Sequence, residues 1–224
     1  MNMEFIGFPK IHRFSQECII TEKIDGTNAQ IYIVPEDEVS RHASIDTKQS
    51  IFYDPVSHFF MFAGKRTQYI TPENDNHGFA KWVKENSVDL LKLGPGRHFG
   101  EWWGQGIQRK YGLKEKRFSL FNVIRWDVDM FYKFKIRPWE DGDRKSPRPE
   151  FIFPPPCCST VPVIVIGILG EIDIGNVIHN LSCLGSHAAP GFMKPEGIVI
   201  YHVASNVMFK KTIGKDDEPK SGKG

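Results

Sequence analysis

The sequence predicts an α+β fold built on antiparallel sheets. Most of its apolar stretches alternate or are rich in β-branched and aromatic residues, whereas only residues 79–93 and 172–184 have helical spacing. Helices and strands do not follow one another in regular alternation, which argues against a doubly wound α/β fold. With 40% apolar and 12% aromatic residues, the 224-residue chain can bury the core of one large domain.

The first part of the chain predicts two strands joined by a tight turn. Asp25 and Gly26 lie between two β-rich runs, and Asp-Gly at such a place favours a hairpin because Gly accepts a positive φ. We therefore expect residues 17–34 to form one hairpin. An irregular strand at residues 1–16 precedes it. Three of its apolar side chains are expected to be buried: Phe5, Phe8 and Ile11.

The remaining elements follow from periodicity and from Gly and Pro signals. Gly94 ends the helix of residues 79–93, and Gly185 closes the helix of residues 172–184. Polar or proline-rich composition predicts a loop at 35–50, a surface insertion at 138–160 and a disordered tail at 214–224. Six further stretches read as strands: residues 59–63, 98–106, 117–126, 161–166, 196–201 and 206–213.

Composition narrows the class of protein. A net charge of +2 neither announces nor excludes nucleic-acid binding, since clustering matters more than the total. The N-terminus has no signal-peptide pattern, and the most apolar run, residues 161–169, is too short to span a bilayer and contains Pro162. The four cysteines have no zinc spacing, so we expect reduced thiols and a cytoplasmic location. We expect no association with a membrane.

Several familiar signatures are missing from the sequence. Gly64 and Lys65 lack the flanking residues of a P-loop, and residues 104–109 lack the third Gly of a dinucleotide fingerprint. No Ser stands in a Gly-x-Ser-x-Gly elbow, and no His-Glu-x-x-His zinc motif occurs. A nucleotide would have to be bound by another device.

The stretch from Glu22 to Asn28, which reads Glu-Lys-Ile-Asp-Gly-Thr-Asn, is the most informative motif. Taken alone it has two interpretations. Lys23 is either a solvated lysine in a hairpin or a nucleophile at the base of a cleft, because a lysine amine forms covalent intermediates when its neighbours lower its pKa. Other motifs decide between them.

These motifs occur in a fixed order along the chain. They are Lys23 in Lys-Ile-Asp-Gly-Thr-Asn, Arg66, Glu101 in Phe-Gly-Glu-Trp-Trp, Phe121 in Phe-Ser-Leu-Phe-Asn-Val, Glu196 in Glu-Gly-Ile-Val-Ile, and Lys210 with Lys211. In this order the chain resembles, up to about Ile213, the covalent nucleotidyltransferases: ATP-dependent DNA ligases, RNA ligases and mRNA capping enzymes.

One position narrows the resemblance. DNA ligases and capping enzymes typically have Arg where this chain has Asn28, which is similar to the RNA ligases of the repair and editing group. Three further phrases resemble small phage and bacterial members: Phe-Pro-Lys-Ile-His-Arg (8–13), Gly-Glu-Trp-Trp-Gly-Gln-Gly-Ile-Gln (100–108) and Ala-Ala-Pro-Gly-Phe (188–192).

The resemblance implies a nucleotidyltransferase (ATP-grasp-like) domain at residues 1–213, with the nucleotide in a cleft between the sheets and without an OB-fold or other C-terminal domain. It also implies the reaction. Lys23 attacks the α-phosphorus of ATP to give lysyl-AMP, AMP passes to an RNA 5′-phosphate, and a 3′-OH then displaces AMP. The implied partners are nicked-duplex or single-stranded RNA ends, bound by a monomer in a bacterial or phage-infected cell.

The resemblance also implies roles for single residues. Glu101 holds the ribose hydroxyls, Phe121 stacks on adenine, with Phe118 as second choice, and Glu196 binds Mg²⁺ or Mn²⁺. Catalytic roles are implied for Lys23, Lys210, Lys211, Arg66 and Asn28. Cofactor contacts are implied for Glu22, Lys23, Ile24, Asn28, Arg66, Glu101, Phe121, Glu196 and Lys210.

Structural alternatives stand beside these roles. Glu101 can be an ordinary strand residue, Phe121 a core residue and Arg66 a surface residue. Lys210 is the better phosphate contact, because the adjacent Lys211 faces the other way on a strand. In the insertion, the basic residues are either solvated or contact phosphate: Arg144, Lys145 and Arg148.

Two rivals to an RNA ligase remain. One is a DNA ligase or capping enzyme on the same core, and the other is a non-catalytic module that binds adenylate or RNA. As a minimal ligase, the chain is expected to adenylylate itself readily but to bind RNA weakly unless an accessory RNA-binding partner compensates.

Overall fold

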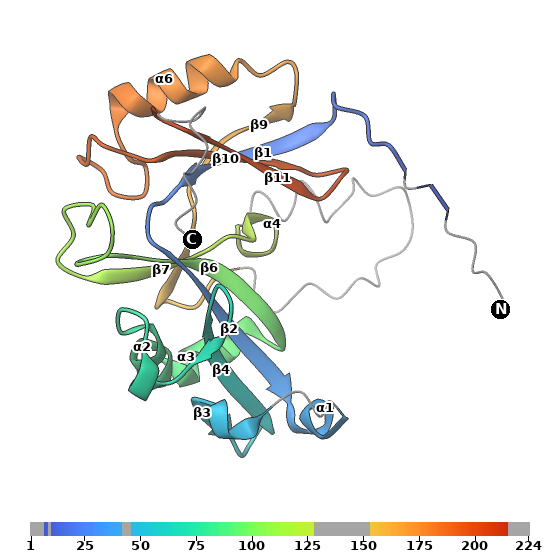
Figure 1. Ribbon diagram of the computed structural model, residues 1–224, viewed down its shortest axis with the longest axis vertical. Coiled ribbons are helices and arrows are strands. Elements are labelled where there is room, and N and C mark those ends of the chain that lie inside the picture. Colours follow the sequence, from blue (N-terminus) through green and yellow to red (C-terminus); the bar gives the residue numbers. More distant parts are fainter. Residues whose placement is uncertain (1–6, 9, 42–45, 128–152, 215–224) are drawn as a thin grey trace, which may run out of the picture. The chain divides into compact units, whose positions relative to one another are not determined.

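The computed structural model describes residues 7–8, 10–41, 46–127 and 153–214, which form two units (Figure 1). The first unit comprises Met1–Lys23, Pro162–His187 and Met193–Gly224, and the second Ile24–Val161 and Ala188–Phe192. Each has one sheet with few helices, which confirms the predicted α+β class. That the nucleotide lies in a cleft remains a prediction. Within the described residues, no helix is long and apolar enough to cross a membrane.

The first unit is a four-stranded antiparallel sheet in the order β11-β10-β1-β9. Its strands are β1 (Glu17–Lys23), β9 (Val163–Ile168), β10 (Gly197–His202) and β11 (Val207–Thr212). Helix α6 (Ile174–Leu184) begins at Asp173, whose side chain accepts a hydrogen bond from the amide of Asn176. The helix packs on one face of the sheet, where Leu181 is buried with Cys18, Ile20, Ile198 and Ile200.

The second unit has a seven-stranded sheet in the order β3-β4-β2-β6-β7-β8, with β5 paired to β4. All of its pairs are antiparallel except β7 with β8. The strands are β2 (Thr27–Pro35), β3 (Phe52–Asp54), β4 (Phe59–Lys65), β5 (Tyr69–Ile70), β6 (Gly96–Gly104), β7 (Lys116–Leu120) and β8 (Cys158–Thr160). The helical segments are α1 (Glu36–Arg41), η1 (Thr47–Gln49), η2 (Pro72–Asn74), α2 (Phe79–Glu85), α3 (Ser87–Leu90), η3 (Leu91–Leu93) and α4 (Val123–Trp126).

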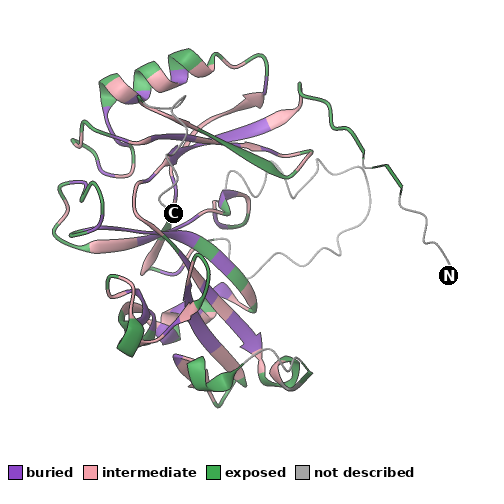
Figure 2. Ribbon diagram, in the orientation of Figure 1, coloured by how far each residue is buried: buried purple, intermediate pink, exposed green. Residues whose placement is uncertain are grey.

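The two faces of the seven-stranded sheet differ because side chains alternate along each strand. One face is the core face, where Ile31, Met61 and Trp102 are buried with Phe79 and Leu90 of the helical segments. Figure 2 shows buried residues gathered along β2 and β4. The other face carries a different set of side chains: Asn28, Gln30 and Tyr32 of β2, and Arg97, Phe99 and Glu101 of β6. We call it the open face.

The predicted hairpin at residues 17–34 is wrong. Strand β1 belongs to the four-stranded sheet and β2 to the seven-stranded sheet, so the chain leaves one sheet at Lys23 and enters the other at Thr27. Gly26 is required because there is no room for a Cβ atom, and not because its φ angle is positive. A Cβ there would lie 2.4 Å from the carbonyl oxygen of Trp102 and 2.7 Å from the Cβ of Trp103.

Two other predicted elements end early. The helix predicted at 79–93 breaks at Asn86, whose side chain donates to the carbonyl of Trp82, and α3 and η3 follow. The strand predicted at 117–126 ends at Leu120, because the Asn122 side chain accepts from the amide of Arg125 and begins the short helix α4.

The N-terminal predictions also need correction. Phe8 and Ile11 are 86% and 80% exposed, because the chain before Glu17 does not join a sheet within the described residues. Phe5 lies outside the described residues. The loop predicted at 35–50 begins with helix α1, whose first turn is acidic and therefore suits the positive end of the helix dipole.

The other predicted strands and the helix at 172–184 are confirmed to within two residues at each end. Most of the insertion predicted at 138–160 lies outside the described residues, including Arg144, Lys145 and Arg148. Its last three residues form β8, which pairs with β7. The tail predicted at 214–224 lies outside them as well, except for Gly214.

Candidate functional site

Lys23, the predicted nucleophile, is the last residue of β1 and pairs with Gly197, the first residue of β10. This register brings Glu196, which directly precedes β10, beside the lysine. The Nζ of Lys23 lies 2.6 Å from Oε2 of Glu196, and the two side chains are 25% and 17% exposed. The structure therefore brings together the predicted nucleophile and the predicted metal carboxylate in a half-buried ion pair.

The two lysines of β11, Lys210 and Lys211, lie on opposite faces of the four-stranded sheet. Thr212 pairs with Gly197 and Gly197 with Lys23, so these three residues lie in one row across the sheet. Lys210, two residues before Thr212, is exposed on the same face as Lys23. Lys211 instead shares the face of Ile198, which is buried against α6. Lys210 is thus the lysine that shares a face with the predicted nucleophile.

Glu22, predicted to contact the cofactor, has a buried side chain with 1% exposure. One of its carboxylate oxygens accepts a hydrogen bond from the hydroxyl of Ser186 at 2.6 Å, and the other accepts from the amide of His187 at 2.8 Å. The residue before Lys23 therefore ties β1 to the segment that follows α6. Neither Ser186 nor His187 was predicted, since nothing local in the sequence marks a partner so far along the chain.

The residues after Lys23 are held by the second unit. Oε1 of Glu101 accepts from the amide of Gly26 at 3.0 Å, and Oε2 accepts from the side-chain amide of Asn28 at 3.2 Å. Glu101 and Asn28 are direct partners in the β6–β2 ladder, and Glu101 is 8% exposed. The predicted ribose-binding residue thus also fixes the turn into β2. Ile24, predicted to contact the cofactor, is buried at 4% exposure.

A loop after β6 adds two residues that the sequence analysis missed. Nε of Arg109 lies 2.8 Å from Oδ2 of Asp25, and the amide of Asp25 donates to the hydroxyl of Tyr111 at 2.7 Å. Gln108, Lys110 and Tyr111 have φ angles of 41°, 59° and 51°, a conformation that is strained for residues other than Gly. The strained loop therefore presents both side chains to Asp25. The glycines within residues 104–112 were its only sequence signal.

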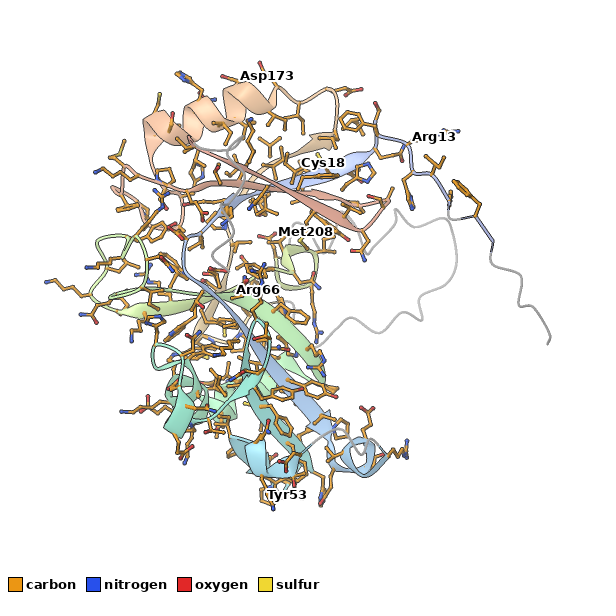
Figure 3. All side chains as sticks on the ribbon, viewed as in Figure 1. Arg13, Cys18, Tyr53, Arg66, Asp173 and Met208 are labelled. Carbon is orange, nitrogen blue, oxygen red and sulfur yellow. The ribbon has the colours of Figure 1, made fainter. Side chains whose placement is uncertain are left out.

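Two predicted residues, Asn28 and Glu101, are paired on the open face, and two more directly follow strands of the same sheet. Arg66, labelled in Figure 3, is exposed and directly follows Lys65, the last residue of β4, which pairs with Ala29. Phe121 follows β7 and is half-buried, and its amide donates to the carbonyl of Phe99 at 3.0 Å.

The other aromatic candidates belong to the protein interior. Phe118, the second choice for adenine, is 1% exposed and packs against Phe79 and Trp82 with ring centroids 5.2 Å and 5.8 Å apart. Trp102 and Trp103 are both buried, at 2% and 1% exposure. Phe121 is therefore the accessible aromatic residue of its motif.

The donor set can be tested for a divalent ion. Within the described residues, no group of three or more His, Cys, Asp or Glu side chains could hold a metal ion. Mg²⁺ commonly binds through one or two carboxylates together with waters and substrate phosphates. Glu196 alone, with a partly exposed carboxylate, fits such an ion as a partner of nucleotide phosphates.

The chain was compared with curated proteins and with solved structures. No curated protein matches it. Its fold is similar to an apo variant of Naegleria gruberi RNA ligase, with a TM-score of 0.52, 16% identity and coverage of 88% of this chain and 50% of that one. It is also similar to a variant of that enzyme with ATP and Mn, with a TM-score of 0.52, 16% identity and coverage of 90% and 51%.

The chain thus spans about half the length of the solved structures that it matches. At this identity the likeness concerns the fold alone. The sequence itself matches the family model described as RNA ligase over residues 16–215. This match covers most of the chain, and the chain therefore belongs to the RNA ligase family.

Proposed function

We propose that this protein is an ATP-dependent RNA ligase with Lys23 as its nucleophile and residues 1–213 as its catalytic domain. The observation that carries the proposal is the half-buried pair of Lys23 with Glu196, on the sheet face that also bears Lys210. Membership of the RNA ligase family supports it. A lysine that is held beside a carboxylate, with a second lysine on the same face of the sheet, is suited to attack a phosphate.

In the first step, the neutral amine of Lys23 attacks the α-phosphorus of ATP. A P–N bond forms, the bond to the β-phosphate breaks, and pyrophosphate leaves. The amine must first lose its proton to solvent, and the carboxylate of Glu196, 2.6 Å from Nζ, positions the lysine. Lys210 contributes positive charge toward the phosphates.

A divalent ion, Mg²⁺ or Mn²⁺, would be held by Glu196 and would supply positive charge that favours the neutral amine and stabilises the transferring phosphoryl group. Variants of the Naegleria gruberi enzyme with ATP and Mn have been solved. By analogy, Mn²⁺ is a reasonable first choice beside Mg²⁺ in an assay.

The open face would serve the nucleoside and the later steps. We assign Glu101 to the ribose hydroxyls, Phe121 to the adenine ring, and Arg66 to a phosphate. Asn28, exposed beside Glu101, would act when AMP passes to an RNA 5′-phosphate and a 3′-OH displaces it. The proposed setting is RNA repair in the cytoplasm of a bacterial or phage-infected cell.

The test is mass spectrometry of the purified protein after incubation with ATP and Mg²⁺, beside Lys23→Ala. We expect one AMP adduct on the wild type, its removal by pyrophosphate, and its absence from the variant. Discharge of the adduct onto 5′-phosphorylated RNA, with sealing to a 3′-OH, would establish the ligase.

Other results would contradict the proposal. An adduct with GTP in place of ATP would indicate capping chemistry, and discharge onto nicked DNA in preference to RNA would indicate a DNA ligase. If no nucleotide gave an adduct, the proposed enzymatic activity would be rejected, and a non-catalytic module that binds adenylate or RNA would be favoured.

A further inference from the structure

Five side chains of the open face form a group that the proposed reaction does not use: Gln30, Tyr32, Tyr69, Arg97 and Phe99. We call them the arginine–tyrosine strip. Gln30 pairs with Phe99 and Tyr32 with Arg97 across β2 and β6, so these four occupy two successive rows of the sheet. Tyr69 of β5 pairs with Gly64, which pairs with Gln30, and its ring lies beside those of Tyr32 and Phe62.

Arg97 is at the centre of the strip. Its guanidinium carbon lies 4.0 Å from the ring centroid of Tyr32, which is the geometry of a cation–π contact. Its Nη1 donates to the hydroxyl of Tyr69 at 2.9 Å and to Oε1 of Gln30 at 3.3 Å. These contacts hold an exposed guanidinium over an aromatic ring.

The strip also offers aromatic surface. Phe99 is 52% exposed although it belongs to a central strand of the sheet, where side chains are usually covered. Phe62 pairs with Tyr32 across β4 and β2 and is fully buried, so its ring packs beside those of Tyr32 and Tyr69 on the same face. A rigid platform of rings beside a cation is the surface on which unpaired nucleotides stack.

The strip continues directly from the candidate nucleotide site. Asn28 and Glu101 form the neighbouring row on the same face, two residues from Gln30 and Phe99 along their strands. Two residues of a strand span roughly 7 Å, so the second row of the strip begins about 14 Å from Asn28. That length suits the first unpaired nucleotides beyond a reacting end.

We propose that the arginine–tyrosine strip binds single-stranded RNA, with bases stacked on Phe99 and the Arg97–Tyr32 pair and a phosphate bound by Arg97. The inference rests on the proposed function, because it takes the occupant of the neighbouring row to be a nucleotide. Charge favours this occupant, since Arg97 of the strip and Arg66, directly after β4, are both exposed cations.

The test measures binding of a short 5′-phosphorylated single-stranded oligoribonucleotide by fluorescence anisotropy, without ATP, at several salt concentrations. We expect Phe99→Ala to weaken binding by about 5- to 150-fold, the range of one lost base stack, with an unchanged salt slope. Arg97→Gln should weaken binding and also reduce the salt slope by about 0.7, the value for one phosphate of a single strand. Lys81→Gln on α2, which removes an exposed cation on the side of the core face, is the control.

Wild-type affinity in both strip variants would overturn the proposal. So would a loss of ATP affinity without a loss of RNA affinity, because the strip would then belong to the nucleotide site. The melting temperature of each variant checks its fold. The binding assay contains no ATP and is therefore independent of the adduct assay. Failure of Lys23 to form an adduct would contradict the proposed function, but the binding result could still be interpreted.

Discussion

The hydroxyl of Ser186 donates to the buried carboxylate of Glu22 at 2.6 Å, across 164 positions of the chain. The residue before the predicted nucleophile is thus an internal anchor, and its second oxygen is also used, by the amide of His187. Resemblance alone assigned Glu22 to the cofactor. In the structure, its carboxylate ties the end of β1 to the segment after α6.

Glu22→Gln should therefore lower stability. The amide keeps the size of the side chain but places an NH₂ group where one of two donors now finds an acceptor, at a cost of about 1–3 kcal/mol in the free energy of unfolding. Urea denaturation measures it. Glu85→Gln, in an exposed pair with Lys81, is the control and should change stability by less than about 1 kcal/mol. Equal effects of the two changes would contradict the anchor.

The two adjacent lysines of β11 should differ in effect. Lys210 shares the face of Lys23, whereas Lys211 shares the face that packs on α6. Lys210→Ala should slow formation of the AMP adduct by about 100-fold, the usual cost of one lost electrostatic stabiliser. Lys211→Ala should give a smaller loss. Quenched-flow labelling with radioactive ATP compares them, and the reverse order would refute the facial assignment.

Gly26→Ala should destabilise the protein because a Cβ would lie 2.4 Å from the carbonyl oxygen of Trp102. The backbone or the neighbouring indole must move, which costs about 1–3 kcal/mol. Gly167→Ala is the matched control, since its nearest neighbour is the flexible side chain of Ile172 at 3.2 Å. Thermal unfolding compares the two, and a larger loss at Gly167 would contradict the close packing.

His98 should make stability depend on pH. Its Nε2 lies 2.9 Å from the carbonyl of Gly94, which can only accept, so this nitrogen carries the proton of the neutral ring. Burial, aided by the charge of Arg125, lowers the pKa of His98 from 6.5 to about 4. Between these values the unfolded chain binds a proton that the folded protein does not bind. The free energy of unfolding therefore falls as the pH drops from 6.5 to 4, by about 3 kcal/mol in total from this residue.

His98→Gln isolates that contribution. The glutamine amide can still donate toward Gly94 but does not titrate. The variant should therefore lose less stability than the wild type between pH 6.5 and pH 4 in urea titrations. Parallel pH profiles of the two proteins would show that His98 does not titrate differently in the folded and unfolded chains.

Local signals explain which elements could be predicted. Helix α6 has an Asp at its start and a Gly at its end, and its predicted range was nearly correct. The turn at Asp25 and Gly26 was recognised but misinterpreted. Turn chemistry is the same whether the two flanking strands pair with each other or enter different sheets, and only distant partners decide between these outcomes.

The sequence predicted those site residues that belong to recognisable motifs. The sequence located Lys23 and Glu196, and the register of β1 with β10 accounts for their meeting. It could not locate Arg109 and Tyr111, because their contacts with Asp25 cross more than 80 positions. The strained backbone that presents them has no local signature beyond nearby glycines.

The central place of β1 in its sheet has a consequence for biosynthesis. Its hydrogen-bonding neighbours are β9 and β10, which begin at Val163 and Gly197. A ribosome makes β1 before both of these strands, so β1 cannot complete its pairing until β10 has emerged. Closing such long loops is slow. Lys23 is thus synthesised long before Gly197, the residue that it pairs with in the folded sheet.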